Sequence, residues 1–486
     1  MKTIAQRLAE YAHNLKYADL PQEVVHEAKR RVIDSIGCAI GAFGSEPSRI
    51  ARKIATDLNP HPSRPSKKRG SSFQATILGT NIETAPDLSA FANGVAIRYL
   101  DYNDTYLAKE PAHPSDNISA CLAVAEDEGR SGKDLITAIV LAYEIQCRLC
   151  DAASLRARGW DHVTYGAFSA TLGAAKLMNL SIEKTIHALG LAGAANIALR
   201  QTRVGELSMW KGCAFANSAR NAVFAAMLAK YGMTGPAPIF EGEKGFIKQV
   251  SGTLNLEAFG GKKRPFKILD TYIKFYPAEY HSQSAIEAAL SLRREIVAQG
   301  FSPPPLSPSM RGIKGEDIKS IEIKTFDAAY EIIGSRPERW SPKTRETADH
   351  SLPYCVAVAF MDGKVGLDQF SERRIKDPKL HSLIQKVSVV RNRGLTAQYP
   401  EAMPNIIKVI TKDGRQFLKK VAYPKGHPKN PMTDNEVEEK FKSLAEGHVS
   451  PKDTDTMLNM LWRLEKIRFV NKFFSNLQFN DIKLLI

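Results

Sequence analysis

The stretch VTYGAFSATLGAAKLMNL (163–180), continued by SIEKTIHALGLAGAANIAL (181–199), decides the fold class. Glycine and alanine recur among its apolar residues, and side chains this small let helices approach each other closely. The longest uncharged run, Thr185–Leu199, has 15 residues, fewer than the roughly 20 that a membrane-spanning helix needs. Helices that are apolar on nearly every face are buried in large domains. We therefore predict a dense bundle of buried helices.

Helical periodicity extends on both sides of this stretch, over about the first 269 residues. Pro21 is placed to begin one helix and Ser131 to cap another. After a turn-rich segment that ends near residue 432, two amphipathic patterns follow, DNEVEEKFKSLAEG (434–447) and DTDTMLNMLWRLEKI (453–467). We predict that these C-terminal helices return to the first domain.

The intervening residues follow a different pattern. KSIEIKTF (319–326) and QKVSVVRN (385–392) alternate as strands do, and IIKVITKDGRQFLKKVAY (406–423) reads as a hairpin that turns at Asp413-Gly414. DHSLPYCVAVAFMDG (349–363) reads as a buried helix. The chain is therefore expected to be mainly α, with a large discontinuous all-helical domain (1–269 and 423–486) and a smaller α+β domain (270–422).

The composition narrows the class of partner. The net charge is +15 and the pI about 9.4, so anionic partners are favoured: a nucleic acid, a membrane surface or a polyanionic small molecule. The six cysteines show no disulfide spacing, which indicates a reducing compartment, and the N-terminus lacks the apolar core of a secretory signal. A cytoplasmic protein is expected. A basic loop (59–70) and a proline-rich loop (301–315) are expected at the surface.

Clusters of charged residues occur within otherwise apolar sequence at five places: YLDYNDTYLAKEPAHPSD (99–116), RGWDHVTYGAF (158–168), RQTRVGELSMWKGCAFANSAR (200–220), IKFYPAEYHSQS (273–284) and SPKTRETADHS (341–351). Each has a simpler explanation. Asp101 and Asp104 could form a turn, His162 could cap a helix, and Lys211 could lie at the surface between two helices. Five such clusters together indicate a polar site.

The motifs expected of several kinds of site are missing from the sequence. It contains no HExxH, no complete calcium loop, no dinucleotide or phosphate-binding glycine pattern and no GxSxG. The remaining interpretation is acid–base chemistry, without metal or cofactor, on an anionic substrate. Removing a proton next to a carboxylate builds up negative charge, which clustered Lys and Arg would stabilise.

The chain resembles the MmgE/PrpD family over nearly its whole length. The resemblance rests on LDYNDTY with AHPSD, GWDHVTYGAF, ALRQTRVGELSMWKGCAFANSAR, TGPAPIFEGEKGF, KFYPAEYHSQSA and WSPKTRETADHSLPY. It implies a helical domain with an α+β lid, a homodimer, and an active site between the domains that needs no metal. By motif it places Asp101, Thr105, His113, His162, Lys211 and Lys274 in that site.

The last two motifs are most similar to the dehydratase branch of the family, and Glu279 stands where the decarboxylase pattern has a histidine. The resemblance therefore implies removal of water from 2-methylcitrate to give 2-methyl-cis-aconitate, a step in propionate catabolism, with citrate as a further candidate substrate. In this hypothesis His162 or His113 is the base, and His113, Asp101 or Tyr280 protonates the leaving hydroxyl. Arg203, Lys211, Lys274 and Arg345 hold the three carboxylates, and Thr105, Glu279 and His281 complete the binding residues.

Two alternatives are kept. The first is another family reaction on a related acid, such as cis-aconitate decarboxylation or an epimerisation. The second is a non-catalytic helical scaffold whose basic surface binds nucleic acid, which predicts that the named residues do not cluster. The basic residues lie beside histidines and carboxylates rather than among aromatics, so we expect neither nucleic acid nor a membrane as a partner.

Overall fold

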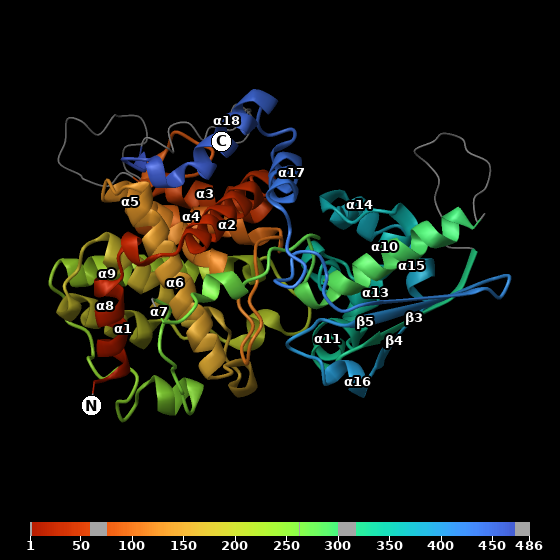
Figure 1. Cartoon of the computed structure of the whole chain (residues 1–486), viewed down its shortest axis with the longest axis horizontal. Coiled ribbons are helices and arrows are strands. Elements are labelled where there is room, and N and C mark those ends of the chain that lie inside the picture. Colours follow the sequence, from red (N-terminus) through yellow and green to blue (C-terminus); the bar gives the residue numbers. More distant parts are fainter. Residues whose placement is uncertain (1, 59–74, 262, 300–316, 472–486) are drawn as a thin grey trace. The chain divides into compact units, whose positions relative to one another are not determined.

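The computed structural model describes residues 2–58, 75–261, 263–299 and 317–471 (Figure 1). The described residues form two compact units. Unit 1 contains those of Met1–Arg203, Met209–Ile273 and Thr433–Ile486, and unit 2 contains those of Val204–Ser208 and Lys274–Met432. The chain is mainly α with a smaller α+β part, as predicted. The boundaries 269/270 and 422/423 stay a proposal about independently folding domains. The loops expected at 59–70 and 301–315 lie outside the described residues.

Unit 1 is built from helices, with one two-stranded ribbon. The helices are α1 (Ile4–Asn14), α2 (Gln22–Gly41), α3 (Glu46–Asp57), α4 (Pro86–Tyr99), α5 (Ile118–Asp127), α6 (Gly132–Ala152), α7 (Val163–Leu177), α8 (Ile182–Ala195), α9 (Trp210–Lys230), α17 (Asp434–Ala445) and α18 (Pro451–Trp462). The ribbon pairs β1 (Ala75–Thr76) with β2 (Glu83–Thr84). Pro21 and Ser131 stand at the N-caps of α2 and α6, as expected.

Helix α7 covers the first part of the glycine- and alanine-rich sequence 163–199, and it is buried along its length except at Lys176. Its glycines explain how it fits. A Cβ at Gly166 would come within 2.4 Å of the Phe215 ring on α9, and one at Gly173 within 2.9 Å of the Cys121 sulfur on α5. Side chains of any size would push these helices apart. The prediction of a dense, buried bundle is confirmed for this helix.

The expectation that Thr185–Leu199 is one buried helix is only partly right. Helix α8 ends at Ala195, and the Leu199 side chain is 62% exposed. One face of the helix, including Ala188 and Leu189, packs in the bundle, whereas Ala194 and Ala195 are exposed. Alanine-rich sequence forms a helix whether or not both faces are covered, so the missing charges did not require complete burial.

The C-terminal helix α17 packs against α2 within unit 1. Buried Lys440 anchors it: its Nζ lies 2.6 Å from Asp34 Oδ1 on α2 and donates to the Tyr102 carbonyl at 2.7 Å. A buried ammonium needs such partners because water no longer solvates it. The last described helices therefore help to hold the loop that follows α4.

Unit 2 contains a four-stranded sheet in the order β4-β3-β5-β6. Its strands are β3 (Ile318–Thr325), β4 (Val387–Arg391), β5 (Asn405–Thr411) and β6 (Gln416–Val421); β3 and β4 are parallel and the other pairs antiparallel. Its helices are α10 (Gln283–Ala298), α11 (Asp327–Ala329), α12 (Arg345–Ala348), α13 (Leu352–Asp362), α14 (Glu372–Ile375), α15 (Pro378–Ile384) and α16 (Arg393–Thr396).

The predicted strands, the hairpin at Asp413-Gly414 and the buried helix after residue 349 are confirmed in unit 2. Gly414 has φ +87°, the left-handed conformation that glycine adopts most easily in a hairpin turn. Ser351 caps α13 by accepting from the Tyr354 N–H. Helices α10 and α13 pack against each other and against the sheet (Figure 1).

Candidate active site

The loop from Leu100 to His113, here called the His113 loop, belongs to unit 1. Backbone hydrogen bonds and one carboxylate hold it in place. Thr105 pairs with Tyr272, and Tyr106 pairs with Ala112. The Asp104 carboxylate accepts from the Ser115 N–H at 2.9 Å and from the Tyr143 hydroxyl at 2.8 Å. Burial raises the pKa of Asp104 despite the nearby Arg31 guanidinium. Asp104 therefore serves to shape the loop.

Arg98, in the last turn of α4, connects three polar residues. Its guanidinium forms an ion pair with Asp101 and places Nη2 3.0 Å from Nε2 of His113. Its Nε lies 3.8 Å from Asp116 Oδ2. Asp101 has φ +52°, which is uncommon for a residue with a side chain. The turn that allows this conformation brings the Asp101 carboxylate back to the guanidinium.

Lys211 is buried, which excludes the simpler explanation that it is a surface lysine between two helices. It belongs to the first turn of α9, and its Nζ lies 3.5 Å from Asp101 Oδ2. Asp101 thus carries its charge between an ammonium and a guanidinium. Charged groups are stable away from water only when they are paired with opposite charges. The burial of Lys211 therefore depends on its contact with Asp101.

A second carboxylate, Asp161, orients His162 at the start of α7. Asp161 Oδ1 lies 2.9 Å from His162 Nδ1, and Oδ2 accepts from Arg203 Nε at 2.9 Å. Burial favours the neutral form of Asp161, but Arg203 and His162 outweigh it and hold its pKa below the usual range. An ionised Asp161 requires His162 to carry its proton on Nδ1.

The other ring nitrogen of His162 is in an unusual position. Nε2 is buried and has no hydrogen-bond partner among the residues that the structure describes. Burial is the largest cause that lowers the pKa of His162 to about 4; Asp161 opposes the shift, and Arg203 and Arg98 add to it. The imidazole is therefore neutral at physiological pH, and Nε2 has a lone pair available to accept a proton.

His113 lies beside His162 but is engaged differently. The ring centroids are 5.6 Å apart. His113 Nδ1 is 2.8 Å from the Asp104 carbonyl oxygen, to which it must donate. A guanidinium only donates, so His113 Nε2 must accept from Arg98. Both nitrogens of His113 thus have defined roles in this structure, in contrast to His162.

The predicted residues of unit 2 form their own group around the short helix η8 (Tyr280–Ser282). Glu279 accepts from the His281 backbone N–H at 2.8 Å and lies 2.6 Å from His281 Nδ1. Burial favours the neutral form of Glu279, but its basic neighbours, His281 first among them, lower its pKa. Lys274 and Tyr280 are fully buried nearby in the chain, and Arg345 lies over the Phe370 ring in the same unit.

Unit 1 brings together five of the predicted site residues: Asp101, His113, His162, Arg203 and Lys211. A scaffold without a site predicted no such cluster. Thr105 belongs to the same loop, but its hydroxyl donates to the Ala112 carbonyl at 3.0 Å. The predicted residues of unit 2 are Lys274, Glu279, Tyr280, His281 and Arg345, and their functional roles stay predictions.

Sequence reasoning missed Arg98, Asp116 and the role of Asp161. Burial raises the pKa of Asp116 to about 7, against the influence of Arg98. A signal for Arg98 was present: it is the only basic residue of PDLSAFANGVAIRY, a helix whose other residues are mostly small or apolar. For Asp161, the adjacent histidine was noted, but spacing in the sequence gives no information on which ring nitrogen it contacts.

Comparison with known proteins identifies the family. The MmgE/PrpD N-terminal domain matches residues 6–258, and the MmgE/PrpD C-terminal domain matches residues 276–466. These matches cover most of the chain. The chain belongs to the MmgE/PrpD family, as its sequence motifs predicted.

Three relatives show the range of named activities. The mitochondrial 2-methylcitrate dehydratase of Yarrowia lipolytica is 29% identical over 453 residues, which are 87% of this chain and 80% of the relative. The 2-methylcitrate dehydratase of Escherichia coli K12 is 29% identical, over 82% and 80% of the two chains. Alkylcitrate dehydratase phiI of a fungus (strain ATCC 74256) is 29% identical, over 90% and 86%. In the described part of this chain, no helix is long and apolar enough to span a bilayer.

Proposed function

We propose that this protein is a hydro-lyase that removes water from 2-methylcitrate to give 2-methyl-cis-aconitate, without a metal or organic cofactor. The observation that carries the proposal is the buried Nε2 of His162, which has no hydrogen-bond partner within the described ranges and is oriented by Asp161 beside a cluster of cations. The relatives' names support a dehydratase that acts on a citrate skeleton. The reaction would serve propionate catabolism, as the resemblance implies.

His162 is the base in this proposal, and His113 is not. A general base needs a free lone pair at the reacting atom and must be unprotonated at the working pH. His162 meets both requirements, whereas His113 Nε2 accepts from Arg98. His162 Nε2 would take the proton from the carbon next to a carboxylate, and the electron pair of that C–H bond would form the new double bond as the hydroxyl leaves.

The cations stabilise the substrate and the charge that develops on it. In unit 1, Arg98, Arg203 and Lys211 lie against Asp101 and Asp161. Burial raises the pKa of a third carboxyl group, Asp116, to about 7, so below that pH the cations outnumber the carboxylates and favour an anion. Proton removal turns a carboxylate into a more highly charged aci-carboxylate, and fixed cations are most effective at that point. We propose that Arg203 and Lys211 bind carboxylates in unit 1 and that Lys274 and Arg345 do so from unit 2.

The proton donor to the leaving hydroxyl is assigned by elimination. The Asp101 carboxylate already forms ion pairs with Arg98 and Lys211, so it is not the donor in this proposal. His113 donates its single proton to the Asp104 carbonyl. Of the three candidates this favours Tyr280, whose phenol carries a proton at neutral pH. With that proton the hydroxyl departs as water. His162 then releases the proton that it took and Tyr280 regains one, so each turnover forms one double bond and one water.

Thr105, Glu279 and His281 keep their proposed place among the binding residues, in narrower roles. With its proton given to Ala112, the Thr105 hydroxyl can only accept, so it would bind a substrate hydroxyl rather than a carboxylate. Glu279 and His281 satisfy each other, which favours a role in holding the chain around Tyr280. A cytoplasmic location stays a prediction; one relative is named as mitochondrial.

The test is an assay with a defined substrate series. The purified protein is treated with a chelator and incubated with 2-methylcitrate, citrate and citrates with longer alkyl groups, and the absorbance of the new double bond is followed. Turnover of 2-methylcitrate that survives chelation is expected. Loss of activity on chelation would overturn the metal-free mechanism. Release of carbon dioxide from cis-aconitate without dehydration would overturn the assignment to dehydratases.

A further inference from the structure

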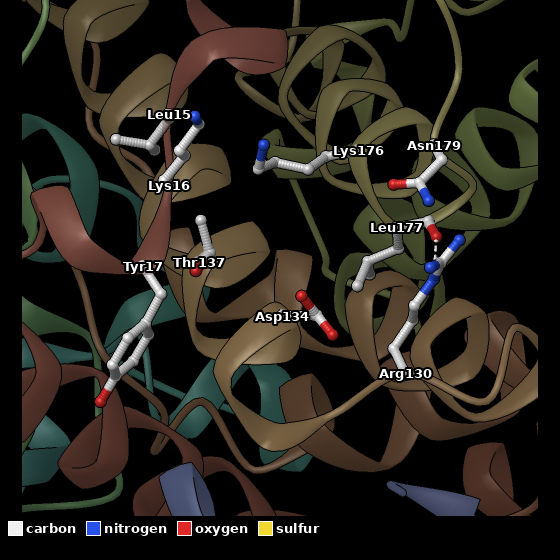
Figure 2. Close-up of a pocket in the computed structure, with 9 residues that line it drawn as sticks. All are labelled: Leu15, Lys16, Tyr17, Arg130, Asp134, Thr137, Lys176, Leu177 and Asn179. Carbon is white, nitrogen blue, oxygen red and sulfur yellow. Dashed lines mark hydrogen bonds between the residues drawn. The ribbon is translucent and has the colours of Figure 1, made fainter. Parts of the chain in front are cut away.

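Unit 1 contains a cavity of about 190 Å³. It lies where the segment after α1 meets the start of α6 and the end of α7, and we call it the α7 end cavity (Figure 2). A cavity needs only about 15 Å³ to hold a single water molecule, so this cavity is large enough for a small solute. Its lining includes Lys16, Arg130, Asp134, Lys176 and Asn179.

The charge of the lining is mainly positive. The lining contains three cations, Lys16, Arg130 and Lys176, and one carboxylate, Asp134 (Figure 2). That carboxylate is already committed, because Asp134 Oδ2 accepts from the Ser131 backbone N–H at 3.0 Å and from its hydroxyl at 2.6 Å to cap α6. The excess of positive charge is therefore not balanced within the cavity.

Lys176 is the one residue of α7 that is not fully buried in the helical bundle. Its Nζ donates to the Ala12 carbonyl at 2.8 Å, which uses one of the three N–H groups. Neither Lys176 nor Lys16 has a carboxylate oxygen within 4.0 Å of its Nζ among the residues that the structure describes. In Figure 2 the two ammonium groups lie on the same side of the cavity.

The charged surroundings of Lys176 show what an anion would change. Burial is the main cause that lowers its pKa, and Lys16 lowers it further, whereas Asp134 and Asp19 raise it. Two ammonium groups that face one space repel each other. An anion bound between them would convert this repulsion into two attractive contacts.

Most N–H groups of Arg130 are already used in hydrogen bonds, so it contributes charge to the cavity rather than free donors. Its Nε donates to the Leu177 carbonyl at 2.5 Å, at the end of α7. With the Asn179 amide turned so that its oxygen faces the guanidinium, that oxygen accepts from both Nη atoms at 3.1 and 3.2 Å. Arg130 is thus held in place at one side of the cavity. Its Nη2 also lies 3.9 Å from Glu128 Oε2, so the two ammonium groups provide most of the positive charge that is left for an anion.

We propose that the α7 end cavity is a binding site for a small phosphate-type dianion, either inorganic phosphate or the phosphoryl group of a small metabolite. A phosphate matches the site because it offers several acceptor oxygens and about two negative charges to two ammonium groups and a guanidinium. Lys176 lies 14 residues after His162 on the same helix, about 21 Å along its axis at 1.5 Å per residue. The cavity is therefore separate from the candidate active site.

The test is calorimetric titration of the full-length protein with inorganic phosphate in a phosphate-free buffer. One phosphate per chain is expected to bind to the wild type. Lys176→Met and Lys16→Met should each weaken binding about tenfold or more, since each removes a charge-assisted hydrogen bond. Lys53→Met is the matched control and should bind as the wild type does, because Lys53 is exposed on α3 and pairs with Asp57.

A second titration, with glycerol phosphate, distinguishes the two sources of the phosphoryl group: tighter binding than that of inorganic phosphate identifies a metabolite. Lys16 is exposed, so Lys16→Met tests the proposal even if Lys176→Met does not fold. Absence of binding to the wild type overturns the proposal. So does binding that survives both cavity substitutions but is lost in Lys211→Met, because the phosphate would then occupy the candidate active site.

Discussion

Asp161 Oδ1 lies 2.9 Å from Nδ1 of His162, and this one contact leaves Nε2 as the basic atom of the ring. Asp161 is itself held by Arg203. The order guanidinium, carboxylate, imidazole fixes both the orientation and the tautomer of His162. This is the arrangement that a histidine needs to act as a general base rather than as a structural residue.

Replacement of His162 by Asn or Ala is expected to abolish most turnover. Loss of a general base typically costs about 10²–10⁴ in kcat. The fold should survive, because Nε2 makes no hydrogen bond within the described residues. Steady-state kinetics and circular dichroism give the two readouts. His113→Asn is the comparison, and equal turnover of the wild type and His162→Asn would show that the base is another residue.

Asp161→Asn tests the positioning role of the carboxylate. An Asn amide can donate to Nδ1, which would move the His162 proton to Nε2 and block the basic atom. A loss of about 10²–10⁴ in kcat with a smaller change in KM is expected, comparable to that known for such tautomer-fixing carboxylates. Asp161→Glu, which keeps the charge, should recover part of the activity. If the Asn variant instead lost only stability, Asp161 would have a structural role alone.

The pH profile distinguishes His162 from an ordinary histidine. The base works when unprotonated, so activity should persist below pH 6.5 and be lost as the pH falls through about 4, the pKa of buried His162. The measurement is kcat/KM against pH, which reports groups of the free enzyme. Inhibition by tricarballylate over the same range corrects for protonation of the substrate carboxylates. A loss centred near pH 6.5 would contradict the assignment.

Lys211→Met should lower both substrate affinity and stability. Its partner Asp101 keeps Arg98, so the expected loss of stability is about 1–3 kcal/mol, the cost of a buried group deprived of one partner. Adding Asp101→Asn should lower stability further, because it takes the Asp101 carboxylate away from the buried Arg98 guanidinium, and it should not restore turnover. Urea unfolding and substrate kinetics of the single and double variants check this. A single variant with unchanged KM and kcat would remove Lys211 from the site.

Glu126 predicts how stability depends on pH away from the site. It accepts from the backbone N–H of Thr76 at 2.6 Å, and burial raises its pKa to about 8. A carboxyl whose folded pKa is raised contributes stability that is full below its unfolded pKa, near 4.5, and is lost as the pH rises to about 8. Glu126→Gln should flatten this part of the curve. Thermal unfolding of both proteins from pH 5 to 8 is the measurement, and parallel curves would contradict the prediction.

The homodimer that the family resemblance implies has a candidate face on α9. Trp210 and Phe224 on α9 and Tyr231 at its C-cap recur at multiples of seven residues and are 45%, 50% and 74% exposed. Aromatic side chains are enriched at protein–protein interfaces, so these exposed residues are candidates for contact with a second copy. Phe224→Glu should shift the mass measured by light scattering from dimer to monomer, whereas Ile50→Glu on α3 should not. A wild-type monomer would contradict the prediction.

Much of the fold was predictable because local pattern determines local structure. The alternation at 319–326 and the Asp413-Gly414 turn gave strands and a hairpin, and the Gly/Ala spacing of 163–180 gave a buried helix. The burial of 185–199 was overestimated, because absence of charge permits burial without requiring it. For the site, five predicted residues came together in unit 1, but the choice of base and the connecting role of Arg98 did not follow from the sequence.

The sequence by itself determined the family, the alternation of helical and α+β segments, and the residue types that carry the proposed chemistry. Only the tertiary structure decided which of those residues lie close enough together to take part in the proposed reaction. Asp161 and Arg203 are separated by 42 residues and His113 and His162 by 49, yet they meet in one cluster. The ionisation of His162 and the burial of Lys211 depend on neighbours brought together in space, and the free energy of a buried charge depends on those neighbours rather than on distance along the chain.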